Sequence, residues 1–133
     1  MLSEAELDAA VELARRHDEK VLIEEAATGV EVECGVLGNQ IPIASLPGEI
    51  VAHGFSETDW YDYSAKYDEG GMELIIPPRI PEAHARRVQE VSVESFVATE
   101  CEGMARVDCF VTDDGDVVVN ELNTIPGFTS TSV

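Results

Sequence analysis

The stretch GMARVDCFVTDDGDVVVNELN, residues 103–123, consists of two runs rich in apolar residues on either side of an acidic turn. Asp114-Gly115 lies between the runs, and Asp-Gly is a favoured two-residue loop of β-hairpins. The alternation of apolar and polar residues in the first run is typical of a strand that buries one face. The stretch therefore predicts an antiparallel hairpin with strands over 103–112 and 117–123.

The register of this hairpin brings polar side chains together. Pairing outward from a two-residue loop places Asp108 across from Glu121. The same register places Arg106 across from Asn123, and because side chains alternate along a strand, these four residues share one face. The opposite face carries the candidate core residues Val107, Cys109, Val111, Val118 and Leu122, with Asn120 as a polar exception.

Two carboxylates that face each other on adjacent strands repel unless something cationic lies between them. Asp, Glu and Asn oxygens suit a hard ion, so Asp108, Glu121 and Asn123 are candidate ligands of Mg²⁺ or Mn²⁺. Mg²⁺ keeps coordination positions for phosphate oxygens, which makes a nucleotide the next inference. A second interpretation stays open, in which the face is solvated and Arg106 neutralises the acids.

The remaining periodicity predicts the elements that surround the hairpin. Residues 47–71 are polar, aromatic and irregular, and a loop of this length in a small domain is usually functional or disordered. The other ranges predict a capped helix from Ser3 to about 17, a buried strand over 21–23, a half-buried strand over 30–36, its partner over 41–46, and a helix over 82–98. This order predicts an α+β fold with an antiparallel β-sheet and packed helices.

The composition excludes several classes of function. The 133 residues include 8 Lys+Arg and 27 Asp+Glu, so the net charge is −19 and no basic surface is available for nucleic acid or an anionic membrane. The sequence has neither an 18-residue apolar run nor a secretory signal. Its three cysteines lack CxxC spacing, so they indicate neither a disulfide framework nor a zinc site. We expect a cytoplasmic protein.

Three ordered motifs connect the sequence to a known family. They are YDYSAKY at 61–67, RVD at 106–108 and NELNTIPGFT at 120–129. Together they resemble the C-terminal part of D-alanine–D-alanine ligases, which belong to the ATP-grasp superfamily. The resemblance runs from about residue 21 to 132. It implies that 1–31 end the nucleotide-binding subdomain and that 32–133 form the C-terminal subdomain of the ATP-grasp fold, truncated at its C-terminus.

The resemblance also implies an activity and partners. Ligases of this family join two D-alanine molecules for peptidoglycan, using ATP to convert the first carboxylate to an acyl phosphate that the second amine attacks. It implies ATP and two Mg²⁺ or Mn²⁺ ions as cofactors. The expected partners are two D-alanine molecules, the missing N-terminal part of the same enzyme and a second copy in a homodimer.

The family's metal and catalytic positions fall on the predicted hairpin, in the loop at 61–67 and near the end of the chain. Asp108, Glu121 and Asn123 match the metal ligands, with Glu121 placed to bridge two ions. Arg106 matches the arginine that stabilises charge on the transferring phosphoryl group and on the tetrahedral oxyanion. The catalytic set that the resemblance implies is Arg106, Tyr67 and Ser132, and the substrate set is Gly127, Ser132 and Tyr67.

The nucleotide positions are more widely spread. The resemblance places Glu31 at the ribose hydroxyls, Trp60 against the adenine and Lys66 at the phosphates. The full set expected at the nucleotide is Glu24, Glu25, Ala26, Ala27, Glu31, Trp60, Lys66, Asn120 and Glu121. The residues themselves leave plainer roles open: Trp60 could be a core aromatic, and Lys66 and Glu31 could be solvated.

The sequence departs from the family pattern because it has no counterpart of the glycine-rich loop or of two phosphate-binding lysines. We therefore expect a fragment that is inactive alone, since the charge stabilisation supplied by those lysines is missing. Two alternatives are a non-catalytic acidic module that binds divalent metal, and another ATP-grasp carboxylate–amine ligase. The loop at 61–67, with Lys66 and Tyr67, argues for the D-alanyl-D-alanine dipeptide.

Overall fold

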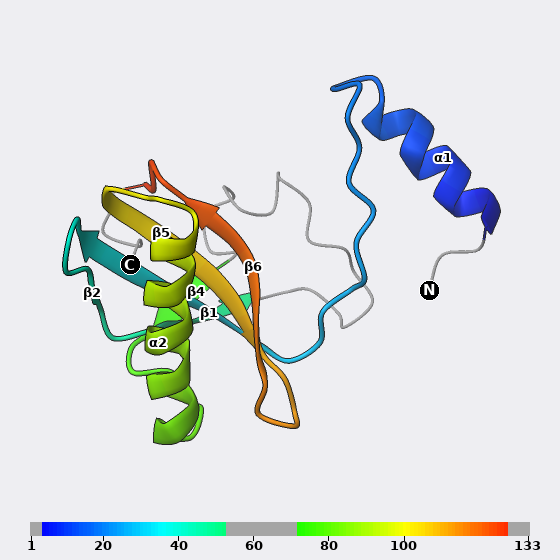
Figure 1. Ribbon diagram of the computed structural model, residues 1–133. Coiled ribbons are helices and arrows are strands. Elements are labelled where there is room, and N and C mark those ends of the chain that lie inside the picture. The colour runs from blue at the N-terminus through cyan, green and yellow to red at the C-terminus, as the bar shows by residue number, and fades with distance from the viewer. Residues whose placement is uncertain (1–3, 53–71, 128–133) are drawn as a thin grey trace.

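A computed structural model of the chain describes residues 4–52 and 72–127. The described chain forms a six-stranded antiparallel sheet in the order β4-β3-β1-β5-β6, with β2 also paired to β1 (Figure 1). The elements are α1 (Glu4–Ala14), β1 (Val30–Gly38), β2 (Ile43–Ala44), β3 (Gly48–Ala52), β4 (Met72–Ile75), α2 (Glu82–Ala98), β5 (Gly103–Val111) and β6 (Val117–Asn123). The predicted α+β fold with an antiparallel sheet is confirmed.

Helix α2 covers one face of the sheet (Figure 1). It begins after Pro81, whose ring fixes φ at a value that suits a helix start. Val88, Ser92 and Phe96 recur every four residues and are fully buried, so they form the inner stripe of the helix. Ser92 is tolerated there because its hydroxyl donates a 2.7 Å hydrogen bond to the Val88 carbonyl. The helix is therefore held by side chains that face the sheet.

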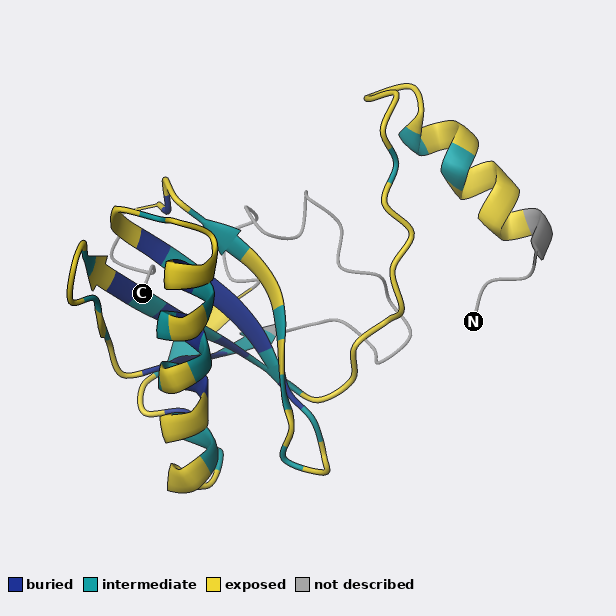
Figure 2. Ribbon diagram, viewed as in Figure 1, coloured by how far each residue is buried: buried dark blue, intermediate teal, exposed yellow. Residues whose placement is uncertain are grey.

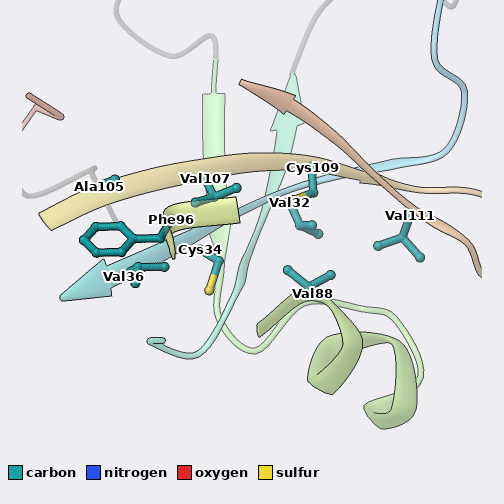
Figure 3. Packing of buried hydrophobic residues seen from close by; sticks show 9 residues of the cluster. All are labelled: Val32, Cys34, Val36, Val88, Phe96, Ala105, Val107, Cys109 and Val111. Atoms are coloured by element: carbon teal, nitrogen blue, oxygen red, sulfur yellow. The ribbon is translucent and has the colours of Figure 1, made fainter. Parts of the chain in front are cut away.

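The core lies between α2 and the two central strands. Figure 3 shows Val88 and Phe96 directed toward the strands. The cluster consists of Val32, Cys34, Val36, Val88, Phe96, Ala105, Val107, Cys109 and Val111. All three cysteines are free, and burial raises the pKa of Cys109 to about 11 and also raises that of Cys34. These two thiols are therefore protonated at neutral pH and act as small apolar side chains.

The turn of the β5–β6 hairpin differs from the prediction. The Thr112 amide donates to the Asp116 carbonyl at 2.9 Å, so three residues, 113–115, form the loop instead of two. Gly115 has φ +86°, and a left-handed residue at this position is typical of three-residue hairpin loops. The Gly115 amide also donates to the Thr112 carbonyl at 2.9 Å. The extra loop residue shifts the pairing nearest the turn by one.

A bulge in β6 reverses that shift. Cys109 pairs with Val119, whereas Asp108 pairs with Glu121, so Asn120 is the extra residue on β6. Between the turn and the bulge, the shifted register corrects the core expected from the sequence. Val118 is exposed, while Val117 and Val119 pack against the core together with Leu122. Beyond the bulge, the predicted pairs of Asp108 with Glu121 and of Arg106 with Asn123 are both confirmed.

The region before β1 departs most from the sequence-based expectation. The predicted strand over 21–23 is wrong, because residues 18–28 adopt no regular structure and Leu22 and Ile23 are 78% and 68% exposed (Figure 2). A short apolar run forms a strand only where a neighbour accepts its hydrogen bonds, and no described strand lies beside it. Helix α1 is present as predicted but contacts none of the other described elements.

Strand β3 lies in the range that we expected to be a loop. Its residues 48–52 pair with β1 and β4, so the prediction of a loop is wrong for them. For residues 53–71 the loop stays a prediction, because they lie outside the described residues. Glu49 on β3 is 6% exposed and accepts hydrogen bonds from the Arg79 amide at 2.8 Å and from its guanidinium. No helix among the described residues is long and apolar enough to cross a membrane.

Candidate functional site

The face of the sheet opposite α2 carries two rows of polar residues. One row crosses three strands as Glu33, Asp108 and Glu121, because Asp108 pairs with Glu33 on β1 and with Glu121 on β6. The neighbouring row is Gly35, Arg106 and Asn123. Directly paired residues of an antiparallel sheet point to the same side, so the two rows form one surface. We call this surface the acidic face.

Arg106 binds the carboxylate of Asp108 on this face. Its Nε and one terminal nitrogen each donate to a different oxygen of Asp108, both at 2.7 Å. The Nε also lies 3.4 Å from an oxygen of Glu33. The Arg106 and Asp108 side chains are 16% and 6% exposed, so this ion pair is shielded from solvent. Such a two-pronged contact is the geometry that a guanidinium favours for carboxylates and phosphates.

Electrostatics on the acidic face favour a further cation. The hydrogen bonds to Asp108 raise the pKa of Arg106, although its burial works against the shift, and Glu33 and Glu121 add to the rise by charge attraction. Arg106 therefore stays charged at every physiological pH. The two rows contain three carboxylates and one guanidinium, which leaves an excess of two negative charges. A divalent cation matches that excess.

The donor set has the chemistry that such a cation requires. Asp108, Glu121 and Asn123 offer oxygens only, which suits Mg²⁺ or Mn²⁺ and not zinc. Within residues 4–52 and 72–127, no three His, Cys, Asp or Glu side chains are arranged to hold a metal ion. Both oxygens of Asp108 are instead engaged by Arg106. The neutralising role that the sequence left open for Arg106 is thus the arrangement observed.

The other predicted site residues lie in different parts of the structure. Glu31 lies on β1, on the acidic face and opposite Phe110. Asn120 is the exposed bulge residue, and Gly127 is exposed beyond the end of β6. Four of the residues expected at the nucleotide lie in the exposed segment before β1, which has no regular structure: Glu24, Glu25, Ala26 and Ala27. The structure therefore gathers Arg106, Asp108, Glu121, Asn123 and Glu31 on one face of the sheet, whereas residues 24–27 lie outside the sheet.

Four predicted site residues lie outside the described residues. They are Trp60, Lys66, Tyr67 and Ser132. Their roles at the adenine, the phosphates and the second substrate stay predictions.

Glu33 was missed by the sequence analysis. Its signal is the alternation of the run that became β1, in which Glu31 and Glu33 point away from the core. That alternation does not say which strand pairs with β1. In the structure β5 pairs with β1, which places Glu33 directly opposite Asp108 and within reach of Arg106.

Comparison with known proteins identifies the chain's relatives. The family model described as D-ala D-ala ligase C-terminus matches residues 1–133. The D-alanine–D-alanine ligase A of Chromobacterium violaceum is 50% identical over 131 residues, covering 98% of this chain and 35% of that protein. The D-alanine–D-alanine ligase of Shouchella clausii is 48% identical over 132 residues, with the same two coverages. The chain thus spans about a third of the length of the curated relatives that it matches.

Solved structures give the same family. The VanG D-Ala:D-Ser ligase of Enterococcus faecalis superimposes with a TM-score of 0.82 at 38% identity, covering 99% of this chain and 37% of that one. The D-alanine–D-alanine ligase of Coxiella burnetii gives 0.75 at 37% identity, covering 100% and 32%. The fold is therefore that of the C-terminal part of these ATP-grasp ligases. The chain belongs to the D-alanine–D-alanine ligase family.

Proposed function

We propose that this chain is the C-terminal part of an ATP-dependent D-alanine–D-alanine ligase, and that its acidic face is the part that binds metal and nucleotide phosphates. The observation that carries the proposal is the pairing of Asp108 with Glu121 on adjacent strands, with Arg106 beside them. Opposed carboxylates are costly in a sheet unless a cation balances them. The family to which the chain belongs is named for a ligase reaction.

Asp108, Glu121 and Asn123 would hold two Mg²⁺ or Mn²⁺ ions, with oxygen ligands that suit such ions. When bound, such ions neutralise the phosphate oxygens of a nucleotide. Arg106 presents a planar fork that stabilises charge on the transferring phosphoryl group and on the tetrahedral oxyanion. Two hydrogen bonds to Asp108 hold that fork on the acidic face in the absence of a bound cation.

The proposed reaction joins two D-alanine molecules in two steps. The carboxylate of the first takes the γ-phosphoryl group of ATP, which gives an acyl phosphate and ADP. The amine of the second attacks the acyl carbon, and phosphate leaves with the C–O bond electrons. We assign the second substrate to Tyr67, Gly127 and Ser132. A relative that is named as a D-Ala:D-Ser ligase shares the fold, so the choice of D-alanine rests on the loop with Lys66 and Tyr67.

The nucleotide would lie along β1 and the segment before it. We assign the ribose to Glu31, the adenine to Trp60 and to the backbone of residues 24–27, and the phosphates to Lys66. A relative from Bacillus anthracis, 30% identical with a TM-score of 0.73, has been solved with ATP. We also propose that two subdomains meet at residue 31 of the chain. We propose further that the enzyme has a preceding N-terminal part, forms a homodimer and is cytoplasmic.

Calorimetric titration of the chain with ATP, with and without Mg²⁺, tests the proposal. We expect weak ATP binding that requires Mg²⁺ and is lost in Glu121→Ala. Glu102→Gln removes one exposed charge just before β5 and serves as the control, which we expect to bind like the wild type. Metal uptake that is indifferent to nucleotide would favour the non-catalytic metal-binding module instead. Dipeptide synthesis by the 133-residue chain would contradict its assignment as an inactive part.

A further inference from the structure

Glu33 has a position that the proposed function does not use. It lies directly opposite Asp108 on β1, and its side chain is 13% exposed. Its Oε1 is 3.4 Å from Arg106 Nε, the same nitrogen that donates to Asp108 at 2.7 Å. One guanidinium is thus placed between two carboxylates, closer to Asp108 than to Glu33.

The cross-strand neighbour of Arg106 explains how its side chain reaches Glu33. Arg106 pairs with Gly35, which has no side chain to stand beside the guanidinium. Glu33 is the diagonal neighbour, two residues along β1, and diagonal pairs in a sheet are within the reach of long side chains. A small rotation of Arg106 about its terminal torsions would therefore exchange one carboxylate for the other.

Such an exchange would matter when a cation binds. Both oxygens of Asp108 accept hydrogen bonds from Arg106, so a divalent ion at Asp108 would share the carboxylate with a guanidinium. Two positive groups on one carboxylate repel, and the repulsion is strong where solvent is largely excluded. A second carboxylate beside the guanidinium lowers the free-energy cost of moving it away.

We propose, on the basis of the function assigned above, that Glu33 is a positioning residue that receives the Arg106 guanidinium when a divalent cation binds at Asp108. Glu33 does not ligate the ion. It keeps Arg106 charged, paired and on the acidic face after Asp108 has been released to the metal.

Mn²⁺ binding to four forms of the full chain tests this role, with free Mn²⁺ measured by electron paramagnetic resonance. The forms are wild type, Glu33→Gln, Arg106→Gln and the double variant. We expect Glu33→Gln to weaken Mn²⁺ binding about tenfold where Arg106 is present and to have little effect where it is absent, which is the coupling expected within one ion-pair network. Equal weakening in both backgrounds would overturn the proposal, because it would show that Glu33 acts only through its charge.

The variant Glu33→Asp separates the effect of the negative charge from the effect of side-chain length. It keeps the negative charge but shortens the side chain, so we expect it to weaken Mn²⁺ binding, whereas an effect of charge alone predicts wild-type affinity. Glu102→Gln is the matched loss of one exposed carboxylate and should bind Mn²⁺ as the wild type does. Thermal unfolding of each variant identifies a purely structural role, which would lower stability while leaving Mn²⁺ affinity unchanged in the folded protein, and that result would also overturn the proposal.

The outcomes distinguish this inference from the function on which it rests. No Mn²⁺ binding by the wild type, either without or with ATP, would overturn both. Wild-type binding that is lost in Glu121→Ala, together with unchanged binding in Glu33→Gln, would overturn the role of Glu33 alone.

Discussion

The two faces of β5 differ in what holds them together. Toward α2, Val107, Cys109 and Val111 are buried in an apolar cluster. Toward the acidic face, Arg106 and Asp108 are also shielded, and they form an ion pair within β5. Alternation along a single strand therefore separates the residues that stabilise the fold from those that we assign to chemistry. Changes on the first face should affect stability alone, and changes on the second should affect both stability and binding.

We expect the largest change in stability from Phe96→Ala on the apolar face. Phe96 is 1% exposed and fills the space between α2 and the sheet, so its removal should lower the free energy of unfolding by about 3–5 kcal/mol. Urea unfolding measures this loss. Mg²⁺-dependent ATP binding should persist at temperatures where the variant stays folded. Loss of binding by a folded variant would mean that the two faces are not independent.

Arg106→Leu should have the next largest effect, because it leaves the shielded carboxylate of Asp108 without its cation. Breaking such a pair costs about 3 kcal/mol. Adding Asp108→Leu to this variant should recover much of the loss, because it removes the carboxylate that is most shielded from solvent and hydrogen-bonded directly to Arg106. Chemical denaturation of both variants measures the recovery. If the double variant is as unstable as the single one, the ion pair is not what stabilises this face.

The paired variants Val119→Ala and Val118→Ala test which side of β6 faces the core. Val119 packs against the cluster, whereas Val118 is 43% exposed on the other face of β6. We expect a loss of about 1 kcal/mol for Val119→Ala and less than about 0.5 kcal/mol for Val118→Ala. A larger loss for Val118→Ala than for Val119→Ala would contradict the register set by the three-residue loop and restore the pairing expected from the sequence.

The smallest effect is expected from pH, through Glu49 on the α2 side. Hydrogen bonds from Arg79 lower the pKa of Glu49 below its ordinary 4.5. A lowered pKa in the folded state means that the ion pair stabilises the fold at pH values above 4.5 and that this stability is lost as the pH falls through the folded value. The melting temperature of wild type should exceed that of Glu49→Gln near pH 7, and the difference should shrink below pH 4.5. A difference that is constant with pH would refute this assignment.

The sequence predicted the acidic face better than it predicted the strands that form it. Asp108 does pair with Glu121, although neither the three-residue loop nor the bulge at Asn120 was anticipated. The loop adds a residue before Val117 and the bulge adds another after Val119, so the two shifts cancel at the site. Periodicity could not reveal either one, because both depend on how the ends of the hairpin pack.

Other errors have a common physical cause. Residues 48–52, GEIVA, follow Pro47 and begin with a glycine, so the sequence assigns them to the irregular range 47–71, yet β1 and β4 flank them and make them a strand. The apolar run at 21–23 is the reverse case, since it has strand composition but no described partner. Strand formation is decided by neighbours that a local pattern does not contain. Glu33 was missed for the same reason, because its role depends on its pairing with Asp108.

The most direct test of the central claim is a Mg²⁺ titration followed by the side-chain carboxyl ¹³C resonances of the chain. Asp108 and Glu121 lie on the acidic face, and Glu49 is the internal control because it lies on the opposite face, paired with Arg79. The account predicts that Mg²⁺ shifts the resonances of Asp108 and Glu121 in a saturable way and leaves that of Glu49 unchanged. Saturable shifts elsewhere with none at Asp108 and Glu121 would contradict it.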